Sequence, residues 1–342
     1  MFQYPAASSS VATSQESKQK KIKSEDIDEF ITKMTSGVKS YLVAEHEAMR
    51  LRQRHIYAFN ANTMKNRYKN IVLFDEGAVT LEPTKPDKPD DTYIHATKIK
   101  SKFGNYVLAQ SPKDDTLNDW YRMIWQLKIG VIVCLIPLTD PKDCSKYFEK
   151  QVGKKIKHKR FVVRTLASRK DGSFKIYDLK LINKDVKDEE RTVQLVNLTE
   201  WKVISRPPEP RKFLDFMRAV WATEASAKLA DEDKVPPTLV HGITGTRRTG
   251  TYVIMSMLCK QMQTSRQMSL LKACSRVRQF RYSVVRNRIC FSLLVESTIT
   301  FAADQGLVDR ATLNFRDALK VVELSTLRDS FSVCVFFLHR FT

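Results

Sequence analysis

The segment from Val240 to Thr251 contains the residues best suited to binding an anion. It reads Val-His-Gly-Ile-Thr-Gly-Thr-Arg-Arg-Thr-Gly-Thr, which is typical of a short strand, a glycine-bearing loop and the start of a helix. The backbone N–H groups of such a loop converge on one point, and the following helix directs the positive end of its dipole there. An arginine at the end of the loop can bind two phosphate oxygens at once. The pattern therefore predicts a phosphate-binding loop made of Gly242, Ile243, Thr244, Gly245, Thr246, Arg247 and Arg248.

The same segment resembles the signature loop of protein tyrosine phosphatases, His-Cys-x-x-Gly-x-x-Arg-Ser/Thr-Gly. The family's cysteine position is occupied by Gly242. The residues that match the signature are His241, Gly245, Arg248, Thr249 and Gly250.

Further motifs follow in the order that the family has. Residues 65–68 (Lys-Asn-Arg-Tyr) resemble the phosphotyrosine-recognition loop, and residues 93–96 (Tyr-Ile-His-Ala) resemble a Tyr-Ile-Asn-Ala strand. Residues 109–112 and 119–125 resemble the Gln-Gly-Pro and Phe-Trp-Arg-Met-Val-Trp stretches. The resemblance spans residues 40–308 and is closest to the non-receptor-like, tyrosine-specific domains. It implies the α/β (α+β) protein-tyrosine-phosphatase fold, a central twisted mixed β-sheet flanked by helices on both faces.

The resemblance also implies that three catalytic roles have lost their residues. In the family a cysteine thiolate attacks phosphorus, and Gly242 has no nucleophilic atom. The family's general acid sits in a Trp-Pro-Asp loop, where this chain keeps Trp201 as the loop hinge but has Val203 in the aspartate position. Valine cannot protonate a leaving phenolate. Arg286 and Cys290 stand where the family has glutamines that position the hydrolytic water. We therefore expect a catalytically degenerate member of the family.

Other residues keep a binding role in this comparison. Arg248 is expected to grip phosphate, and the alternative, a structural arginine that bonds the Trp201 loop, is compatible with that role. Tyr68 is expected to stack on a phosphotyrosine ring, with a half-buried structural tyrosine as the alternative. Asn70 replaces an aspartate that holds the substrate backbone in many members, which lowers the peptide affinity that we expect. Arg247 replaces a family glycine and would strain the loop if this position needs a positive φ.

Three further residues, two glutamates and a histidine, bear on whether the missing chemistry is replaced. Glu200 or Glu209 could replace the missing acid only after a shift of the loop. His241 has no thiolate to tune and is interpreted as structural.

The pattern of apolar residues predicts one α/β domain, with mixed strands and helices on both sides. We expect a disordered basic tail over residues 1–24, the phosphatase-like domain over residues 25–320 and a divergent segment over residues 321–342. The expected helices cover residues 25–58, 114–128, 212–228 and 251–262, with two or three more behind them. The expected strands cover residues 93–96, 106–109, 131–136, 160–167, 174–182, 192–198 and 238–241.

Composition limits the class of protein. The 342 residues carry a formal net charge of +20, which favours anionic partners. The six cysteines form no CxxC pair and indicate reduced thiols. The N-terminus has no signal-peptide pattern, and the longest apolar run, residues 331–338, is far shorter than the roughly 20 residues of a membrane helix. We expect a monomer in the cytoplasm or nucleus, with no membrane span, no metal, no cofactor and no nucleic-acid partner.

The sequence leaves several functions open. The leading hypothesis is a pseudophosphatase that binds phosphotyrosine-containing proteins or a kinase and regulates tyrosine-phosphorylation signalling. One alternative is an active or residually active tyrosine phosphatase. The other is a structural interaction protein with a dead pocket.

Overall fold

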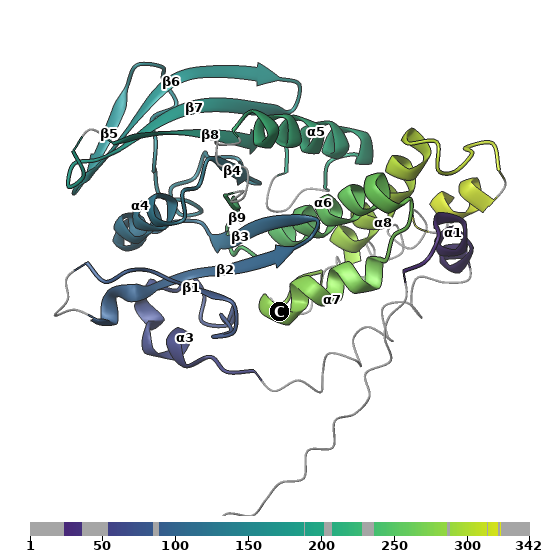
Figure 1. The fold of residues 1–342 in the computed structure, drawn as a ribbon, viewed down its shortest axis with the longest axis horizontal. Helices are drawn as coiled ribbons and strands as arrows, with labels where there is room; N and C mark the ends of the chain where they lie inside the picture. The colour runs from purple at the N-terminus through teal and green to yellow at the C-terminus, as the bar shows by residue number, and fades with distance from the viewer. Residues whose placement is uncertain are drawn as a thin grey trace, which may run out of the picture.

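The computed structural model describes residues 24–35, 54–84, 89–187, 189–201, 207–227, 236–285, 288–312, 314–320 and 322. Figure 1 shows a twisted sheet with helices packed against both of its faces. The described strands form one nine-stranded mixed sheet in the order β1-β2-β3-β9-β4-β8-β7-β6-β5. They are β1 (Ala78–Thr80), β2 (Tyr93–Ser101), β3 (Gly104–Gln110), β4 (Val131–Cys134), β5 (Lys155–His158), β6 (Phe161–Asp171), β7 (Phe174–Asn183), β8 (Glu190–Leu198) and β9 (Thr238–Gly242).

The middle of the sheet is parallel and buried. Strand β9 pairs in parallel with β3 and β4, and β4 pairs in parallel with β8. Both β4 (Val-Ile-Val-Cys) and β9 (Thr-Leu-Val-His-Gly) are buried at every residue, as the near-continuous apolar sequences of parallel strands require. The outer pairs, β1·β2 and β2·β3 on one side and β5 to β8 on the other, are antiparallel.

The two faces of the sheet each have a hydrophobic core, because neighbouring residues of a strand point to opposite faces. Leu239 of β9 belongs to the core beneath α4, and Val240 belongs to the core on the other face. The described helices are α1 (Ile27–Thr35), α3 (Tyr57–Ala61), α4 (Leu117–Gln126), α5 (Pro210–Ser226), α6 (Arg247–Ser265), α7 (Leu270–Phe280) and α8 (Arg288–Asp304). Short 3-10 turns cover Thr63–Lys65, Pro89–Thr92 and Asp114–Thr116.

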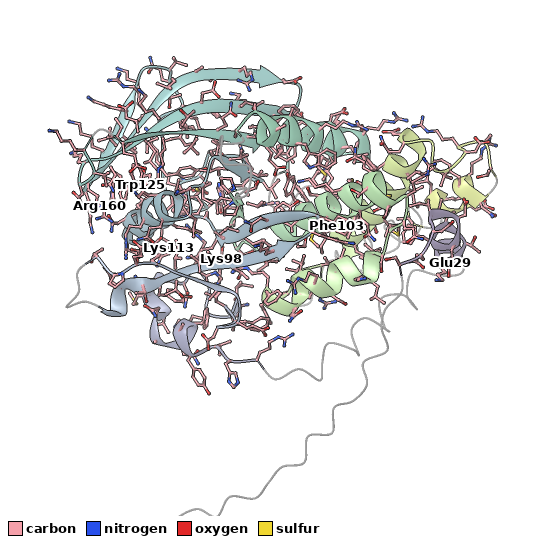
Figure 2. All side chains as sticks on the ribbon, in the orientation of Figure 1. Glu29, Lys98, Phe103, Lys113, Trp125 and Arg160 are labelled. Atoms are coloured by element: carbon pink, nitrogen blue, oxygen red, sulfur yellow. The ribbon has the colours of Figure 1, made fainter. Side chains whose placement is uncertain are left out.

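The helices divide between the faces as the cores do. Helices α5, α6, α7 and α8 supply the core on one face, and α4 supplies the other. At the end of α4 the ring of Trp125 lies 6.4 Å from the ring of Phe161 of β6, close to Arg160 in Figure 2. None of the described helices has the length and apolar character needed to cross a membrane.

The predicted fold class is confirmed, and several element boundaries differ from the expected ones: β2 runs to Ser101 instead of 96, and β6 runs to Asp171 instead of 167. Helix α6 begins at Arg247, four residues before the expected start at 251, because the residues after the loop continue directly into helical hydrogen bonds: the N–H of Gly250 donates to the carbonyl of Thr246 at 2.8 Å. Strands β1 and β5 were not predicted, since both are short and β5 (Lys-Ile-Lys-His) is only half-buried.

The expected helix over residues 25–58 is only partly described. The structure shows α1 inside this range and α3 across its end, residues 54–56 are not helical, and residues 36–53 lie outside the described residues. The N-terminal tail to residue 23 and the segment from residue 323 onward also lie outside them.

Candidate phosphate-binding site

The candidate loop lies between β9 and α6, at the carboxyl end of the parallel part of the sheet. Gly242 is the last residue of β9 and pairs with Gln110, the last residue of β3. Open α/β sheets bind ligands at this edge, because loops there connect strand ends to helix starts. Arg247 is the first residue of α6, so only residues 243–246 separate strand from helix.

The loop encloses a cavity of about 310 Å³. Its lining unites the predicted phosphate-binding residues with Tyr68, which comes from a distant part of the chain. The lining residues are Tyr68, Gly242, Ile243, Thr244, Gly245, Thr246, Arg247, Arg248, Thr249 and Ser283. Two of these are arginines, and none of the described lining residues is an aspartate, glutamate, histidine or cysteine. The cavity is therefore electropositive and lacks a thiol or carboxylate nucleophile.

Arg281 fixes the back of the loop. Its side chain is fully buried, and its Nε and Nη2 atoms each donate a 2.9 Å hydrogen bond to the carbonyl oxygens of Gly245 and Thr244. These carbonyl oxygens are thus directed at a guanidinium group and do not repel an anion in the cavity. Nη1 also donates to the hydroxyl of Thr97 at 3.2 Å, and burial lowers the pKa of Arg281 to about 10.

Strand β3 closes the loop from the other side. The N–H of Ser111 donates to the carbonyl of Ile243 at 3.1 Å. Gly245 has a φ of +66°, and a Cβ atom at this position would lie 2.3 Å from the carbonyl oxygen of Ala109. Only glycine satisfies both the left-handed backbone and this close approach. The loop is therefore held in one conformation by contacts on two sides.

Arg248 is buried at the wall of the cavity with unused hydrogen-bond donors. Its side chain is 6% exposed, and its Nε and Nη2 atoms have no hydrogen-bond partner. The guanidinium carbon lies 5.8 Å from the centre of the Trp201 ring, a cation–π distance. Burial and the neighbouring charge of Arg247 lower the pKa of Arg248 to about 10. The residue is thus still charged at neutral pH and has N–H groups available for an anion.

Arg247 does not strain the loop. It has no positive φ, and it occupies the first helical position of α6. The family's glycine at this position is therefore not required by the backbone that this chain adopts.

Gly242 lines the cavity, and the described residues that line it with Gly242 include no thiol or carboxylate. A Cβ atom built on Gly242 would find its nearest neighbour, the hydroxyl of Thr249, at 3.4 Å. Cys290 is 3% exposed and is not among the residues that line the cavity, and burial raises the pKa of its thiol.

His241 lies behind the loop as a neutral structural residue. Its Nε2 atom is 2.9 Å from the hydroxyl of Tyr147, and its ring makes edge contacts with the rings of Trp120 and Tyr147. Complete burial lowers its pKa to about 3. An imidazole in this state adds no charge to the cavity.

The loop that carries Tyr68 is tied to β3. The N–H of Arg67 donates to the side-chain carbonyl of Gln110 at 3.1 Å, and the Gln110 amide donates back to the carbonyl of Lys65 at 2.8 Å. Tyr68 itself is 45% exposed and lines the cavity. Asn70, two residues further, is exposed and is not among the cavity-lining residues.

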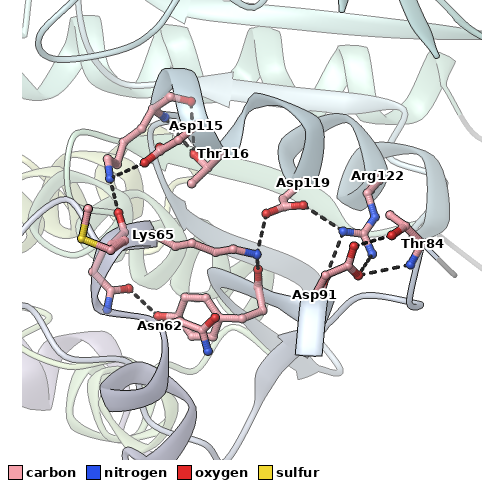
Figure 3. A network of polar contacts seen from close by, with 12 residues as sticks. Asn62, Lys65, Thr84, Asp91, Asp115, Thr116, Asp119 and Arg122 are labelled. Atoms are coloured by element: carbon pink, nitrogen blue, oxygen red, sulfur yellow. Dashed lines mark hydrogen bonds and ion pairs between the residues drawn. The ribbon is translucent and has the colours of Figure 1, made fainter. Parts of the chain in front are cut away.

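A chain of ion pairs supports the same loop from α4. Lys65 lies 2.9 Å from one carboxylate oxygen of Asp119, and Arg122 lies 2.8 Å from the other (Figure 3). Arg122 continues to Asp91 at 3.0 Å. Because Arg122 is buried, this network fixes the start of the Tyr68 loop with little freedom of rotation.

Two residues predicted to matter cannot be placed. Val203 and Arg286 lie outside the described residues. Sequence reasoning missed Arg281 and Ser283, because they lie in an arginine-rich stretch without a recognisable spacing. Ser283 lines the cavity with a φ of +56°, a left-handed conformation that is uncommon for serine.

Comparisons with known proteins agree with this geometry. The family model described as protein-tyrosine phosphatase matches residues 62–300. The chain is 26% identical over 243 residues to human receptor-type tyrosine-protein phosphatase alpha, covering 70% of this chain and 29% of that protein. It is 28% identical over 227 residues to human tyrosine-protein phosphatase non-receptor type 5, covering 65% of this chain and 38% of that protein. It is 26% identical over 246 residues to tyrosine phosphatase H3 of Microplitis demolitor bracovirus, covering 66% of this chain and 76% of that protein. The chain thus spans less than a third of the first of these relatives.

Proposed function

Because the chain belongs to the protein-tyrosine phosphatase family, we propose that its cavity binds phosphotyrosine in partner proteins without hydrolysing it. The observation that carries the proposal is the contrast between Arg248 and Gly242. Arg248 keeps buried N–H donors with no partner, while Gly242 leaves the nucleophile position without a reactive atom. A site that retains its anion ligands and lacks its nucleophile is suited to capture rather than turnover.

The charges support binding of a phosphate group. Arg247 and Arg248 both line the cavity without a carboxylate among the described lining residues. Hydrogen bonds from a charged donor contribute about 1.5–3 kcal/mol each. The Nε and Nη2 atoms of Arg248 are buried without a hydrogen-bond partner, so a phosphate that reaches them breaks no hydrogen bond within the protein.

The position of Tyr68 favours an aromatic phosphoester over free phosphate. Tyr68 lines the same cavity as the loop, and the backbone next to it is held by the hydrogen bond from the Arg67 N–H to Gln110. A phosphotyrosine ring stacked there adds about 0.5–1.5 kcal/mol beyond its buried area. Phosphoserine, which has no ring, would lose this contribution.

The missing reaction follows from the same residues. A covalent phosphoenzyme requires an attacking atom at position 242, and glycine supplies a hydrogen. Val203 would not protonate the leaving phenolate even if water attacked directly. A bound phosphotyrosine would therefore remain intact and shielded, which would prolong or block signalling through that site, in the cytoplasm or the nucleus.

Calorimetry with a matched pair of peptides tests this proposal. The full chain should bind a phosphotyrosine peptide and not its unphosphorylated form, and Arg248→Ala should weaken binding about 100-fold. A turnover assay on p-nitrophenyl phosphate with the same two proteins should show no difference above background. Lack of binding to the phosphorylated peptide would overturn the proposal, and so would turnover that Arg248→Ala abolishes.

A further inference from the structure

One face of the outer sheet carries positive charges in register. Lys155 of β5 pairs with Arg164 of β6, and Arg164 pairs with Lys180 of β7. Directly opposite residues point to the same face, so these three cations form one row across three strands. Lys157, two residues from Lys155, points to this face as well. We call Lys155, Lys157, Arg164 and Lys180 the basic face.

Few charges on the described residues balance the basic face. Lys180 lies 2.5 Å from Glu190, whereas no ion pair within the described residues involves Lys155, Lys157 or Arg164, all of which are exposed. Residues 154–191 contain thirteen lysines and arginines against six aspartates and glutamates. Like charges directly opposite one another destabilise a sheet. This row of cations therefore does not stabilise the fold, which favours a role in binding.

Protection of a sheet edge explains only part of the row. Strand β5 is at the edge of the sheet, and lysines there prevent pairing with other chains. Arg164 and Lys180 lie on β6 and β7, which have partners on both sides. Edge protection therefore does not account for the two inner cations.

Exposed aliphatic side chains accompany the basic face. Leu166 is 42% exposed and lies two residues from Arg164, at a β-bulge between Thr165 and Ala167. The N–H of Gly153 donates to the carbonyl of Thr165 at 2.8 Å, and the residue before Gly153, Val152, is 50% exposed. No large aromatic side chain is exposed among the described residues of 150–198. In Figure 1, β5 and the start of β6 extend past α5.

We propose that the basic face binds the surface of a membrane that contains anionic lipids. A sheet face of separated cations matches a plane of anionic headgroups, and exposed aliphatic residues can enter the boundary between headgroups and chains. Single-stranded nucleic acid is recognised by aromatic stacking in a charged groove, and this face offers neither. Binding here leaves the phosphate cavity unchanged, so the inference does not depend on the proposed function.

Vesicle sedimentation tests the proposal with the full chain. The protein should sediment with vesicles of phosphatidylcholine mixed with phosphatidylserine and not with phosphatidylcholine alone, and added salt should release it. The variant Lys155→Gln/Lys157→Gln/Arg164→Gln should bind on the order of 100-fold more weakly, at about fivefold for each cation removed. Leu166→Ser should weaken binding without changing its salt dependence.

A charge-matched variant controls for non-specific attraction. Lys98→Gln/Lys100→Gln/Lys272→Gln removes the same charge from exposed residues of β2 and α7, and β2 is far from β5 in the strand order (Lys98 in Figure 2). This variant keeps the basic N-terminal residues, as the first variant does, and should bind vesicles like the unmodified chain. Equal loss in both variants would overturn the proposal. Binding of an oligonucleotide through the basic face, with no binding to vesicles, would overturn it too.

Discussion

The hydroxyl of Thr249 lies 3.4 Å from the point that a Cβ atom on Gly242 would occupy. That distance is an ordinary van der Waals contact, so the backbone at position 242 accepts a side chain. The Thr249 hydroxyl is buried and has no hydrogen-bond partner in the structure. A donor of this kind is available to an anion, or to a thiolate, placed at the floor of the cavity.

Restoring the cysteine should therefore leave the fold intact. We expect Gly242→Cys to change the free energy of unfolding by less than about 1 kcal/mol, because the added Cβ meets no atom closer than 3.4 Å. Turnover of p-nitrophenyl phosphate should remain close to background, since Val203 supplies no proton. Gly242→Cys/Val203→Asp should be about 100-fold faster than the single variant, the lower end of what a general acid contributes. Equal rates in the two variants would show that the acid comes from another residue.

The unpaired N–H donors of Arg248 should lower the stability of the free protein and strengthen its binding of phosphate. Replacing this buried, unpaired cation with methionine should raise the free energy of unfolding of the free protein by about 1–2 kcal/mol. The same change should abolish the stabilisation that added phosphate gives to the unmodified chain. Chemical denaturation with and without phosphate measures both effects.

Arg281→Met is the matched control for that experiment. Arg281 is also buried, but its guanidinium satisfies the carbonyls of Thr244 and Gly245. Its removal should cost about 3 kcal/mol or more, because two buried acceptors lose their donor. A stabilising effect of both substitutions would contradict the distinction between a ligand-binding and a structural arginine.

The close approach of Gly245 to Ala109 predicts that alanine is tolerated less well at position 245 than at Gly306, which has a similar backbone conformation. Gly245 and Gly306 have nearly equal φ values of +66° and +64°, but a Cβ on Gly306 would meet no atom within 4 Å. Gly306→Ala should thus cost only the backbone strain, about 1 kcal/mol. Gly245→Ala adds a collision with the carbonyl of Ala109, and we expect it to cost about 3 kcal/mol in total and to eliminate phosphate binding. Similar unfolding midpoints for the two variants would mean that the loop is not held against β3.

The sequence was most informative where neighbouring residues form the site. A strand, a short glycine-bearing loop and a helix start are contiguous, so residues 242–248 could be assigned to one cavity from local pattern alone. Tyr68 was found through its motif, and the structure places it in the same cavity. Asn70, two residues further along the same loop, is exposed and is not among the cavity-lining residues, so its role in holding a peptide backbone stays a prediction.

Contacts between distant segments could not be predicted. Arg281 reaches Gly245 across 36 positions, and nothing in an arginine-rich helix end distinguishes it from the half-buried Arg276 and Arg278. The start of α6 at Arg247 was missed because glycine at position 250 suggested a longer loop, whereas close packing against Val284 requires glycine there within the helix. Strand β5 was missed because an edge strand needs few apolar residues.

Two buried histidines should make the fold sensitive to mild acid. Burial lowers the pKa of His241 and of His95 from 6.5 to about 3, and the Nδ1 atom of His95 lies 3.1 Å from Nη2 of Arg281, a contact that needs an unprotonated acceptor. Below pH 6.5 the unfolded chain takes up protons that the folded chain cannot, so the free energy of unfolding falls as the pH drops from 6.5 towards 3. Each histidine should contribute about 1.4 kcal/mol per pH unit within this window, and neither should contribute above it. Urea denaturation between pH 7 and pH 5 measures the slope, which His241→Gln should reduce by one histidine's share. An unchanged slope in His241→Gln would mean that this imidazole already binds a proton in the folded protein.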